Sequence, residues 1–180
     1  AYSQPLTGSG TEASVNAMTR ADLSAFHQAW FKPNRATLIV AGDIRDLSES
    51  LADQTMERFG RLDIWVNNVG GSDEKTTRTL IDTPDEIFRS QLELNLTSAF
   101  QGCKAAAKRM GPGGSIVNIS SGAGMRGSPF TGPYAAAKAG MNNLTETLAL
   151  ELAPDIRVNT VAPGPVATEA FSEVLGTDGQ

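Results

Sequence analysis

The pattern of hydrophobic positions along the chain changes between two periods, and this predicts a mixed α/β fold. Short apolar runs of strand length occur at 36–41, 63–66, 115–119 and 157–161. Between them, apolar side chains recur every three or four residues, as they do on one face of a helix. Strands that alternate with helices imply right-handed crossovers and a mostly parallel, doubly wound sheet flanked by helices.

Local signals indicate where the predicted helices end. Gly60 is expected to be the C-terminal cap of the first helix that follows the strand at 36–41. Thr83 is expected to cap a helix that has proline at its first position and runs to about Met110. Another helix is expected over 134–152. Because ligands of such sheets bind beyond the carboxyl ends of the strands, the residues after each strand are the first candidates for a site.

Composition and charge exclude several classes of function. The formal charge of −5 and the lack of a Lys/Arg cluster argue against a nucleic-acid partner. No apolar run approaches the roughly 20 residues that span a bilayer, and the first residues show no signal peptide. Cys103, the only cysteine, excludes an intramolecular disulfide and is expected to be a small buried residue. We therefore expect a cytoplasmic protein without nucleic-acid or membrane partners.

One helical segment carries a specific chemistry. Tyr134 and Lys138 are four residues apart, so on a helix they share a face, and Ser121 comes thirteen residues before the tyrosine. A phenol, with a usual pKa near 10, is a poor base at neutral pH, and a nearby ammonium typically lowers such a pKa by about 1–3 units. A serine hydroxyl at the end of the preceding strand can hold a substrate oxygen. Alone, however, this spacing is also that of an ordinary pair of helical residues.

Further motifs before and after Tyr134 and Lys138 support a functional interpretation of this pair. From about residue 43 to 171 the chain resembles the short-chain dehydrogenase/reductase family. The resemblance is carried by the following segments: Asn67-Asn68-Val69-Gly70, Asn95, Ile119-Ser120-Ser121, Tyr134-x-x-x-Lys138 and Arg157-Val158-Asn159-x-Val161-x-Pro163-Gly164. It implies an incomplete, Rossmann-like sheet, an NAD or NADP cofactor and a small alcohol or ketone as substrate. Val69 replaces the alanine that is usual in the family, a small change.

The resemblance also implies a role for each matching residue. Tyr134 would be the general acid/base, Lys138 would support it and hold the nicotinamide ribose, Ser121 would orient the substrate carbonyl, and Asn95 would support a water-linked proton relay. Without that context Asn95 would be interpreted as a helix surface residue. The residues implied to bind the cofactor are Asp43, Ile44, Asn67, Asn68, Gly70, Tyr134, Lys138, Pro163, Gly164, Val166 and Thr168.

The N-terminal stretch departs from this pattern. The glycine-rich turn that should receive a pyrophosphate has one candidate, 6–12, and the family would need glycine where Glu12 and Ser14 stand. Residues 1–43 instead resemble insulinase/pitrilysin-type zinc metallopeptidases. Their His-x-x-Glu-His motif is absent and His27 is the only histidine, so neither a metal site nor peptidase activity is expected. The predicted domains are therefore a peptidase-like segment, 1–43, and a truncated dehydrogenase/reductase domain, 44–180.

Three hypotheses about function follow. The first is an NAD(P)-dependent oxidoreductase that interconverts a secondary alcohol and a ketone. The second is an inactive fragment or chimera that keeps the active-site residues but lacks the pyrophosphate-binding loop. The third is an assembly module, because in the family the helices that bear Asn95 and Tyr134 pack between subunits, which also implies a homo-oligomer.

Overall fold

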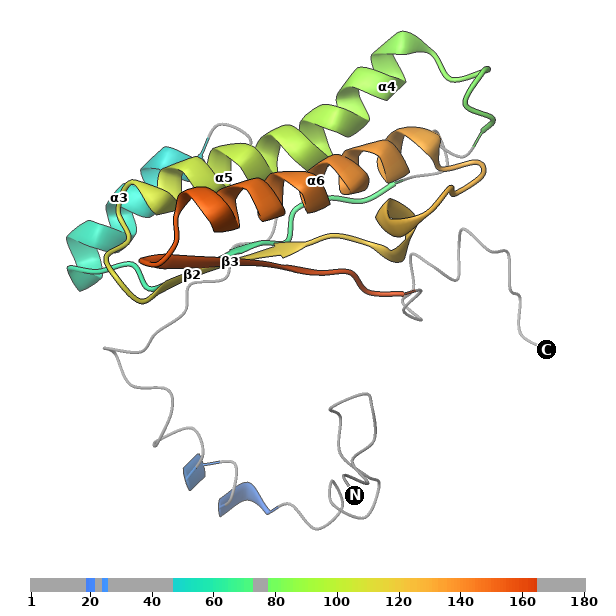
Figure 1. Cartoon of the computed structure of the whole chain (residues 1–180). Coiled ribbons are helices and arrows are strands. Elements are labelled where there is room, and N and C mark those ends of the chain that lie inside the picture. Colours follow the sequence, from blue (N-terminus) through green and yellow to red (C-terminus); the bar gives the residue numbers. More distant parts are fainter. Residues whose placement is uncertain (1–18, 22–23, 26–46, 73–77, 165–180) are drawn as a thin grey trace. The chain divides into compact units, whose positions relative to one another are not determined.

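The computed structural model describes residues 19–21, 24–25, 47–72 and 78–164 (Figure 1). The chain divides into two compact units, 1–36 and 37–180, and every strand and helix named below belongs to the second unit. The predicted strand at 36–41 lies outside the described residues. So do the following candidate site residues: Asp43, Ile44, Val166 and Thr168.

Three parallel strands form the sheet. They are β1 (Ile64–Asn67), β2 (Gly114–Ile119) and β3 (Ile156–Val161), in the order β1-β2-β3. Each lies within one residue of the strand that its apolar run predicts. The middle strand pairs with both neighbours, so that Asn118 is opposite Asn67 on one side and Thr160 on the other. The predicted parallel α/β fold is confirmed, and the sheet is open rather than closed.

The first two helical segments differ in how well their ends follow the sequence. Helix α3 (Ser48–Phe59) ends as predicted at Gly60, which has a left-handed φ of 69° and an amide that donates to Met56 O. The next helix begins one residue later than predicted. Pro84, not Thr83, is its N-cap residue, and the Thr83 hydroxyl instead donates to Thr79 O at 3.0 Å. The predicted threonine cap is therefore wrong.

The predicted long helix consists of three consecutive segments. These are α4 (Asp85–Leu92), a π-helical turn η3 (Glu93–Thr97) and α5 (Ser98–Ala107). Beyond β2 come a short 3₁₀ turn, η4 (Gly122–Met125), and α6 (Gly132–Glu151), which begins two residues before the prediction. The π turn, with Asn95 in its middle, was not predicted. Such turns inside α-helices are frequent at functional sites.

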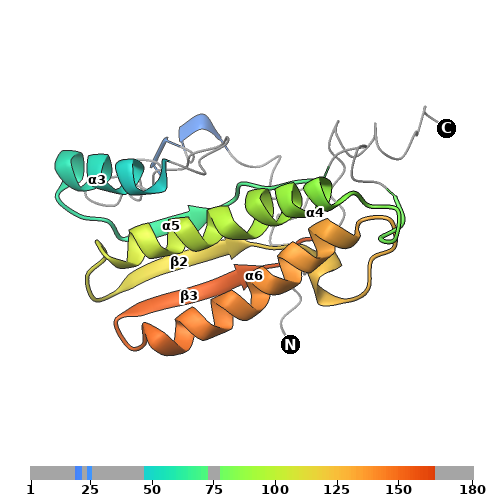
Figure 2. The ribbon, with the colours of Figure 1, turned by 90° about the horizontal axis from the view of Figure 1, so that it is seen from above.

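Helices α5 and α6 run side by side over one face of the sheet, and α3 packs beside α5 (Figures 1 and 2). The core between these layers is built from apolar residues of the sheet, of α3 and α5 and of the turn before β1: Ala52, Leu62, Trp65, Cys103, Ala105, Ala106, Ile116, Ile156 and Val158. Cys103 is buried, as predicted, and this burial raises the pKa of its thiol to about 11. The layered core fixes α6, which carries the candidate chemistry, above β2 and β3.

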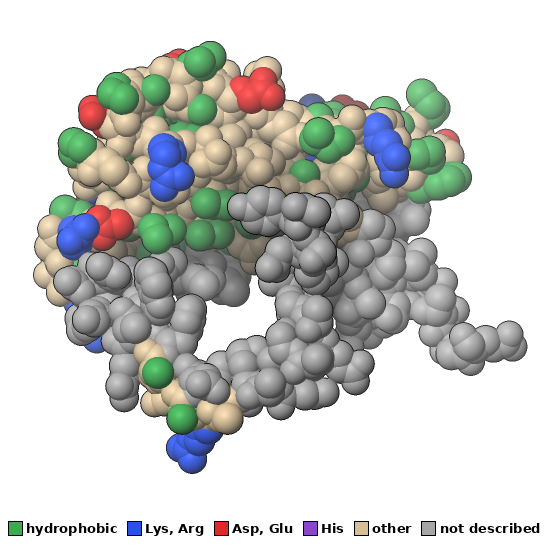
Figure 3. Space-filling model, turned by 60° about the horizontal axis from the view of Figure 1, so that its bottom comes forward, with side chains coloured by type: hydrophobic (Ala, Val, Ile, Leu, Met, Phe, Trp, Pro, Cys, Tyr) green, Lys and Arg blue, Asp and Glu red, His purple; other side chains and the backbone are tan. Residues whose placement is uncertain are grey.

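The surface of the described residues carries charges of both signs. On the face shown in Figure 3, the Lys and Arg side chains stand apart from one another among polar and apolar groups. This face of the described chain therefore offers no continuous basic surface to a phosphate backbone. Among the described residues, none of the helices has the length and apolar character needed to cross a bilayer.

Candidate active site

The candidate site lies where β1 and β2 end, beneath the first turns of α6. Lys138 is 3% exposed and its Nζ donates to the carbonyl oxygen of Ile119, the last residue of β2, at 2.8 Å. The same Nζ is 5.7 Å from the centroid of the Tyr134 ring. The structure thus brings the predicted phenol and ammonium together on one face of α6, as the four-residue spacing requires.

The ammonium of Lys138 has an unusual environment. None of the described residues provides a carboxylate partner for it. Burial, which penalises the charged form, lowers the pKa of Lys138 from 10.5 to about 8. Below that pH the side chain is mostly protonated, so a positive charge lies beside Tyr134 at neutral pH. Strongly perturbed titratable groups of this kind are concentrated at functional sites.

Asn95 is completely buried, so its interpretation as a helix surface residue is wrong. Its Oδ1 accepts a hydrogen bond from Gly71 N at 2.8 Å, and its Nδ2 donates to Gly71 O and to Gln91 O, each at 3.1 Å. These backbone partners fix which way the amide faces. The π turn therefore holds the loop that follows β1 through both polar atoms of Gly71.

Gly70 brings Asn95 and Lys138 to the same place. A Cβ atom added to it would lie 2.5 Å from Asn95 Oδ1 and 3.1 Å from Lys138 Nζ. Its φ of 147° is also one that side chains with a Cβ rarely adopt. The absence of a side chain at Gly70 thus lets the Asn95 amide and the Lys138 ammonium lie close to the loop after β1.

Ser121 follows β2 directly and caps the η4 turn. Its Oγ accepts a hydrogen bond from Ala123 N at 3.2 Å, and among the described residues its hydroxyl proton has no acceptor. The amide of Gly122 donates to Pro163 O at 2.9 Å, which ties the loop after β2 to the loop after β3. Pro163 and Gly164 therefore lie at the same end of the sheet as Ser121.

The two asparagines after β1 have different surroundings. Asn68 is exposed, whereas Asn67 is 3% exposed and belongs to the core. Asn67 accepts a hydrogen bond from Trp65 Nε1 and donates to Asn118 Oδ1, both at 2.7 Å. Any contact between Asn67 and a cofactor would therefore have to involve its backbone. Strand alternation could have indicated this, because Asn67 shares a face with the buried Trp65.

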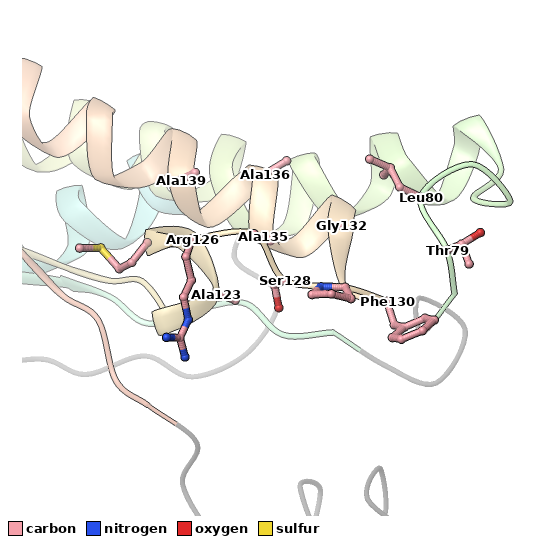
Figure 4. A pocket seen from close by; sticks show the side chains of 14 residues that line it. Thr79, Leu80, Ala123, Arg126, Ser128, Phe130, Gly132, Ala135, Ala136 and Ala139 are labelled. Carbon is pink, nitrogen blue, oxygen red and sulfur yellow. The ribbon is translucent and has the colours of Figure 1, made fainter.

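A pocket of about 870 Å³ lies beside the face of α6 that carries Ala135, Ala136 and Ala139, not Tyr134 and Lys138 (Figure 4). Ala135 and Ala139 of α6, Leu80 and Phe130 line it, with Arg126 at its side. Tyr134, Lys138 and Ser121 are not among its lining residues, but Ala123, whose amide donates to Ser121 Oγ, is one of them. The residues that α6 contributes to the lining, Ala135, Ala136 and Ala139, are all small.

Comparison with known proteins places this site in a class. A family profile described as enoyl-(acyl carrier protein) reductase matches residues 4–180. Over 116 residues the chain is 47% identical to trans-4-hydroxycyclohexanecarboxylate dehydrogenase of Sinomonas cyclohexanicum. The matched residues make up 63% of this chain and 43% of that protein. Over 127 residues it is 40% identical to 3-oxoacyl-[acyl-carrier-protein] reductase of Synechocystis, covering 69% and 50%. All of these are names of oxidoreductases.

Solved structures agree. A short-chain dehydrogenase/reductase from Brucella melitensis superposes with a TM-score of 0.71 at 33% identity, over 88% of this chain and 64% of that one. Carveol dehydrogenase from Mycobacterium avium, in complex with NAD, gives 0.70 at 35% identity, over 87% and 58%. The chain belongs to the short-chain dehydrogenase/reductase family. It spans less than two thirds of the length of each of these relatives.

The comparisons do not support a peptidase-like N-terminal segment. The family profile begins at residue 4, so its match includes nearly all of the stretch for which the sequence suggested a metallopeptidase. That stretch lies outside the described residues except at 19–21 and 24–25. Among the residues that the structure describes, no group of His, Cys, Asp and Glu could hold a metal ion.

Proposed function

We propose that the protein is an NAD(P)-dependent oxidoreductase that interconverts a secondary alcohol and a ketone. The observation that carries this proposal is the buried ammonium of Lys138 beside the ring of Tyr134, with no carboxylate partner among the described residues. An uncompensated buried charge is unfavourable for folding, so a useful chemistry is needed to explain it. The residues proposed for this chemistry all lie within 44–180.

In this proposal Tyr134 exchanges a proton with the substrate oxygen. Among the described residues its hydroxyl has no hydrogen-bond partner, which leaves it available to a ligand. The ammonium of Lys138 stabilises negative charge on the phenol oxygen. Ser121 donates its hydroxyl proton to the substrate oxygen, and Asn95, whose amide is fixed by Gly71, supports a water-linked proton relay to the lysine.

The described residues fit the nicotinamide end of a dinucleotide. Asn68, Gly70 and Gly164 are exposed at this end of the sheet, and the absence of a Cβ at Gly70 brings the loop after β1 close to the Lys138 ammonium. The Tyr134 hydroxyl and the Lys138 ammonium are donors suited to ribose hydroxyls. When bound, the cofactor supplies or accepts the hydride. The structural neighbours include carveol dehydrogenase with NAD and a variant of ElxO with NADPH bound, so we infer either cofactor for this chain.

Cofactor binding is the first test of this proposal. NADH or NADPH added to the full chain should give a saturable change in nicotinamide fluorescence or a binding heat. The complete absence of binding at millimolar cofactor would overturn the oxidoreductase proposal in favour of the inactive-fragment hypothesis.

The role of Tyr134 is tested by a matched pair of variants. Tyr134→Phe should abolish turnover of any alcohol that the protein oxidises, because it removes only the hydroxyl. The chain has one other tyrosine, Tyr2, so Tyr2→Phe makes the same chemical change elsewhere and should leave turnover intact. Full activity of Tyr134→Phe would contradict the proposed mechanism.

We also propose that the chain forms a homo-oligomer through the helices that bear Asn95 and Tyr134. Phe100 on α5 and Leu150 on α6 are exposed apolar residues, and the apolar pocket opens beside α6. Exposed apolar side chains are candidates for burial in an interface. Analytical ultracentrifugation should find a dimer or larger species that Phe100→Asp weakens; a monomer at all concentrations would contradict this.

A further inference from the structure

The end of β2 is tied to α6 through three consecutive residues. Asn118 Nδ2 donates to Thr145 Oγ1 at 2.9 Å, Ile119 O accepts from Lys138 Nζ at 2.8 Å, and Ser120 Oγ donates to Lys138 O at 3.2 Å. Asn118 and Ser120 point to the helix side because strand residues two apart share a face. Both are buried, with exposures of 0% and 4%.

The first of these ties belongs to a polar network that crosses the whole sheet. Asn67, Asn118 and Thr160 are neighbours in register on β1, β2 and β3. Asn67 donates to Asn118, and Thr160 donates to Thr145 Oγ1 at 2.8 Å. Thr145 in turn donates to Met141 O at 2.8 Å. All three strands are therefore connected to one point of α6.

The two attachment points lie on one stripe of α6. Thr145 follows Lys138 by seven residues, which on a helix is about 10.5 Å along the axis and almost two full turns. A rigid helix that is fixed at two points on the same face can neither slide nor rotate without breaking at least one bond. The position of Lys138 Nζ thus depends on bonds made by residues outside the proposed catalytic group.

We propose that Ser120 and Thr145 are positioning residues that hold α6 against β2, so that Lys138 Nζ stays buried at Ile119 O. Ser120 acts at Lys138 itself, because its hydroxyl donates to the main-chain carbonyl oxygen of Lys138. That oxygen also accepts a backbone hydrogen bond within α6. Thr145 acts two turns away, through Asn118 and Thr160. The catalytic meaning of this arrangement rests on the proposed oxidoreductase function, but the arrangement itself can be measured without it.

The test uses the full chain, free of cofactor, and follows the titration of Lys138 by NMR of the lysine side chains. The sequence has five lysines, so the signal can be assigned by its loss in Lys138→Met. Ser120→Ala and Thr145→Val remove the two hydroxyls. Matched controls are Ser115→Ala, on the opposite face of β2, and Thr147→Val, exposed on α6. Thr145→Ser keeps the hydroxyl and serves as the rescue.

We expect Ser120→Ala and Thr145→Val to raise the titration midpoint of Lys138 by roughly one pH unit, because water reaches the loosened ammonium. The controls and Thr145→Ser should titrate like the unmodified chain. If the two variants also titrate like the controls, the positioning proposal is overturned, even if their thermal stability is lower. If Thr145→Val does not fold, Ser120→Ala decides, since Lys138 O keeps its helical donor.

Turnover separates this proposal from the proposed function. With an active chain, Ser120→Ala should lower kcat by roughly tenfold to a hundredfold and leave the KM for the alcohol unchanged. A raised KM at unchanged kcat would overturn the positioning role. If the Lys138 midpoint shifts as expected but the unmodified chain binds no cofactor, the positioning proposal is supported and the oxidoreductase proposal alone fails.

Discussion

Two cations of this molecule, Lys138 and Arg109, are placed in opposite ways. Arg109, just after α5, bonds to Glu49 at 2.6 Å and to Asp53 at 2.7 Å, both on α3. These carboxylates raise the pKa of Arg109, since they bond to the guanidinium and favour its charged form. Lys138 is more deeply buried, finds no carboxylate among the described residues and has its pKa lowered by desolvation.

The difference separates a charge that joins two helices from one that we propose takes part in chemistry. The guanidinium of Arg109 fastens α3 to the end of α5, and its charge is fully compensated where it stands. The ammonium of Lys138 has only a carbonyl oxygen, so its field remains available to a neighbouring group such as the Tyr134 phenol. A buried charge without a counter-ion destabilises the fold and is retained where it serves a site.

The largest expected difference between Lys138 and Arg109 is in their effect on catalysis. Lys138→Met should lower kcat/KM by roughly 10²- to 10⁴-fold, the usual contribution of acid–base machinery, because the charge beside Tyr134 is lost. Arg109→Met, which also replaces a cation by methionine, should leave kcat/KM nearly unchanged. Steady-state kinetics with one alcohol measure both. Equal losses in the two variants would show that Lys138 acts through stability alone.

The second effect concerns the pH dependence of stability. In the unfolded chain Lys138 keeps its usual pKa of 10.5, whereas in the folded protein it is about 8. Between these values the unfolded chain binds more protons, so the stability of the folded state rises with pH there. We expect the free energy of unfolding to increase, relative to Lys138→Met, by on the order of 3 kcal/mol from pH 8 to 10.5.

Denaturant titrations of both proteins at each pH provide this difference. The comparison with Lys138→Met is needed because Cys103 acts in the opposite direction. Its raised pKa of about 11 means that the unfolded thiol ionises first, and stability is lost as the pH rises above the usual thiol value. If the difference in unfolding free energy between the two proteins did not change with pH, the lowered pKa of Lys138 would be contradicted.

The third effect tests the crowding around the ammonium. Gly70→Ala should lower the free energy of unfolding by about 1–3 kcal/mol, because its φ of 147° is unfavourable with a Cβ and that atom would meet Asn95 Oδ1. Gly71→Ala is the matched control, since nothing lies within 4 Å of a Cβ there. Equal stabilities of the two variants would show that the close contact at Gly70 does not require glycine.

The smallest expected effect is on stability and concerns Arg109, whose charge is neutralised by carboxylates. Glu49→Gln weakens one partner of an exposed ion-pair cluster, and such pairs contribute little because water and salt screen them. The melting temperature should fall by less than about 3 °C, and by less again in high salt. Calorimetry at two salt concentrations measures this. A larger fall would mean that Arg109 depends on its partners as strongly as a buried charge does.

Much of the fold could be predicted because its signals are local. The apolar runs give β1, β2 and β3 to within one residue, and Gly60 ends α3 because a left-handed C-cap favours glycine. The π turn around Asn95 could not be predicted, since it changes the helical hydrogen bonds without a distinct residue pattern. The cap at Thr83 failed because its hydroxyl bonds backwards to Thr79 O instead.

The site could be predicted in part. The helical spacing placed Tyr134 and Lys138 on one face, and the structure agrees. It could not show that Asn95 bonds to Gly71, nor that the Ser120 hydroxyl reaches Lys138 O, because both contacts join segments that lie far apart in the sequence. The roles of all the site residues stay predictions until the variants above are measured.

The row of Asn67, Asn118 and Thr160 across the sheet also has a consequence for folding fidelity. The neighbouring row on the same face, Trp65, Ile116 and Val158, is apolar. A slip of one strand by two residues would keep every side chain on its own face, so hydrophobicity alone would hardly reject it. It would, however, place an asparagine amide opposite an apolar side chain in the dry interior, without its hydrogen bonds. The polar row thus makes a two-residue shift in strand register unfavourable during folding. The apolar row alone would not prevent that shift.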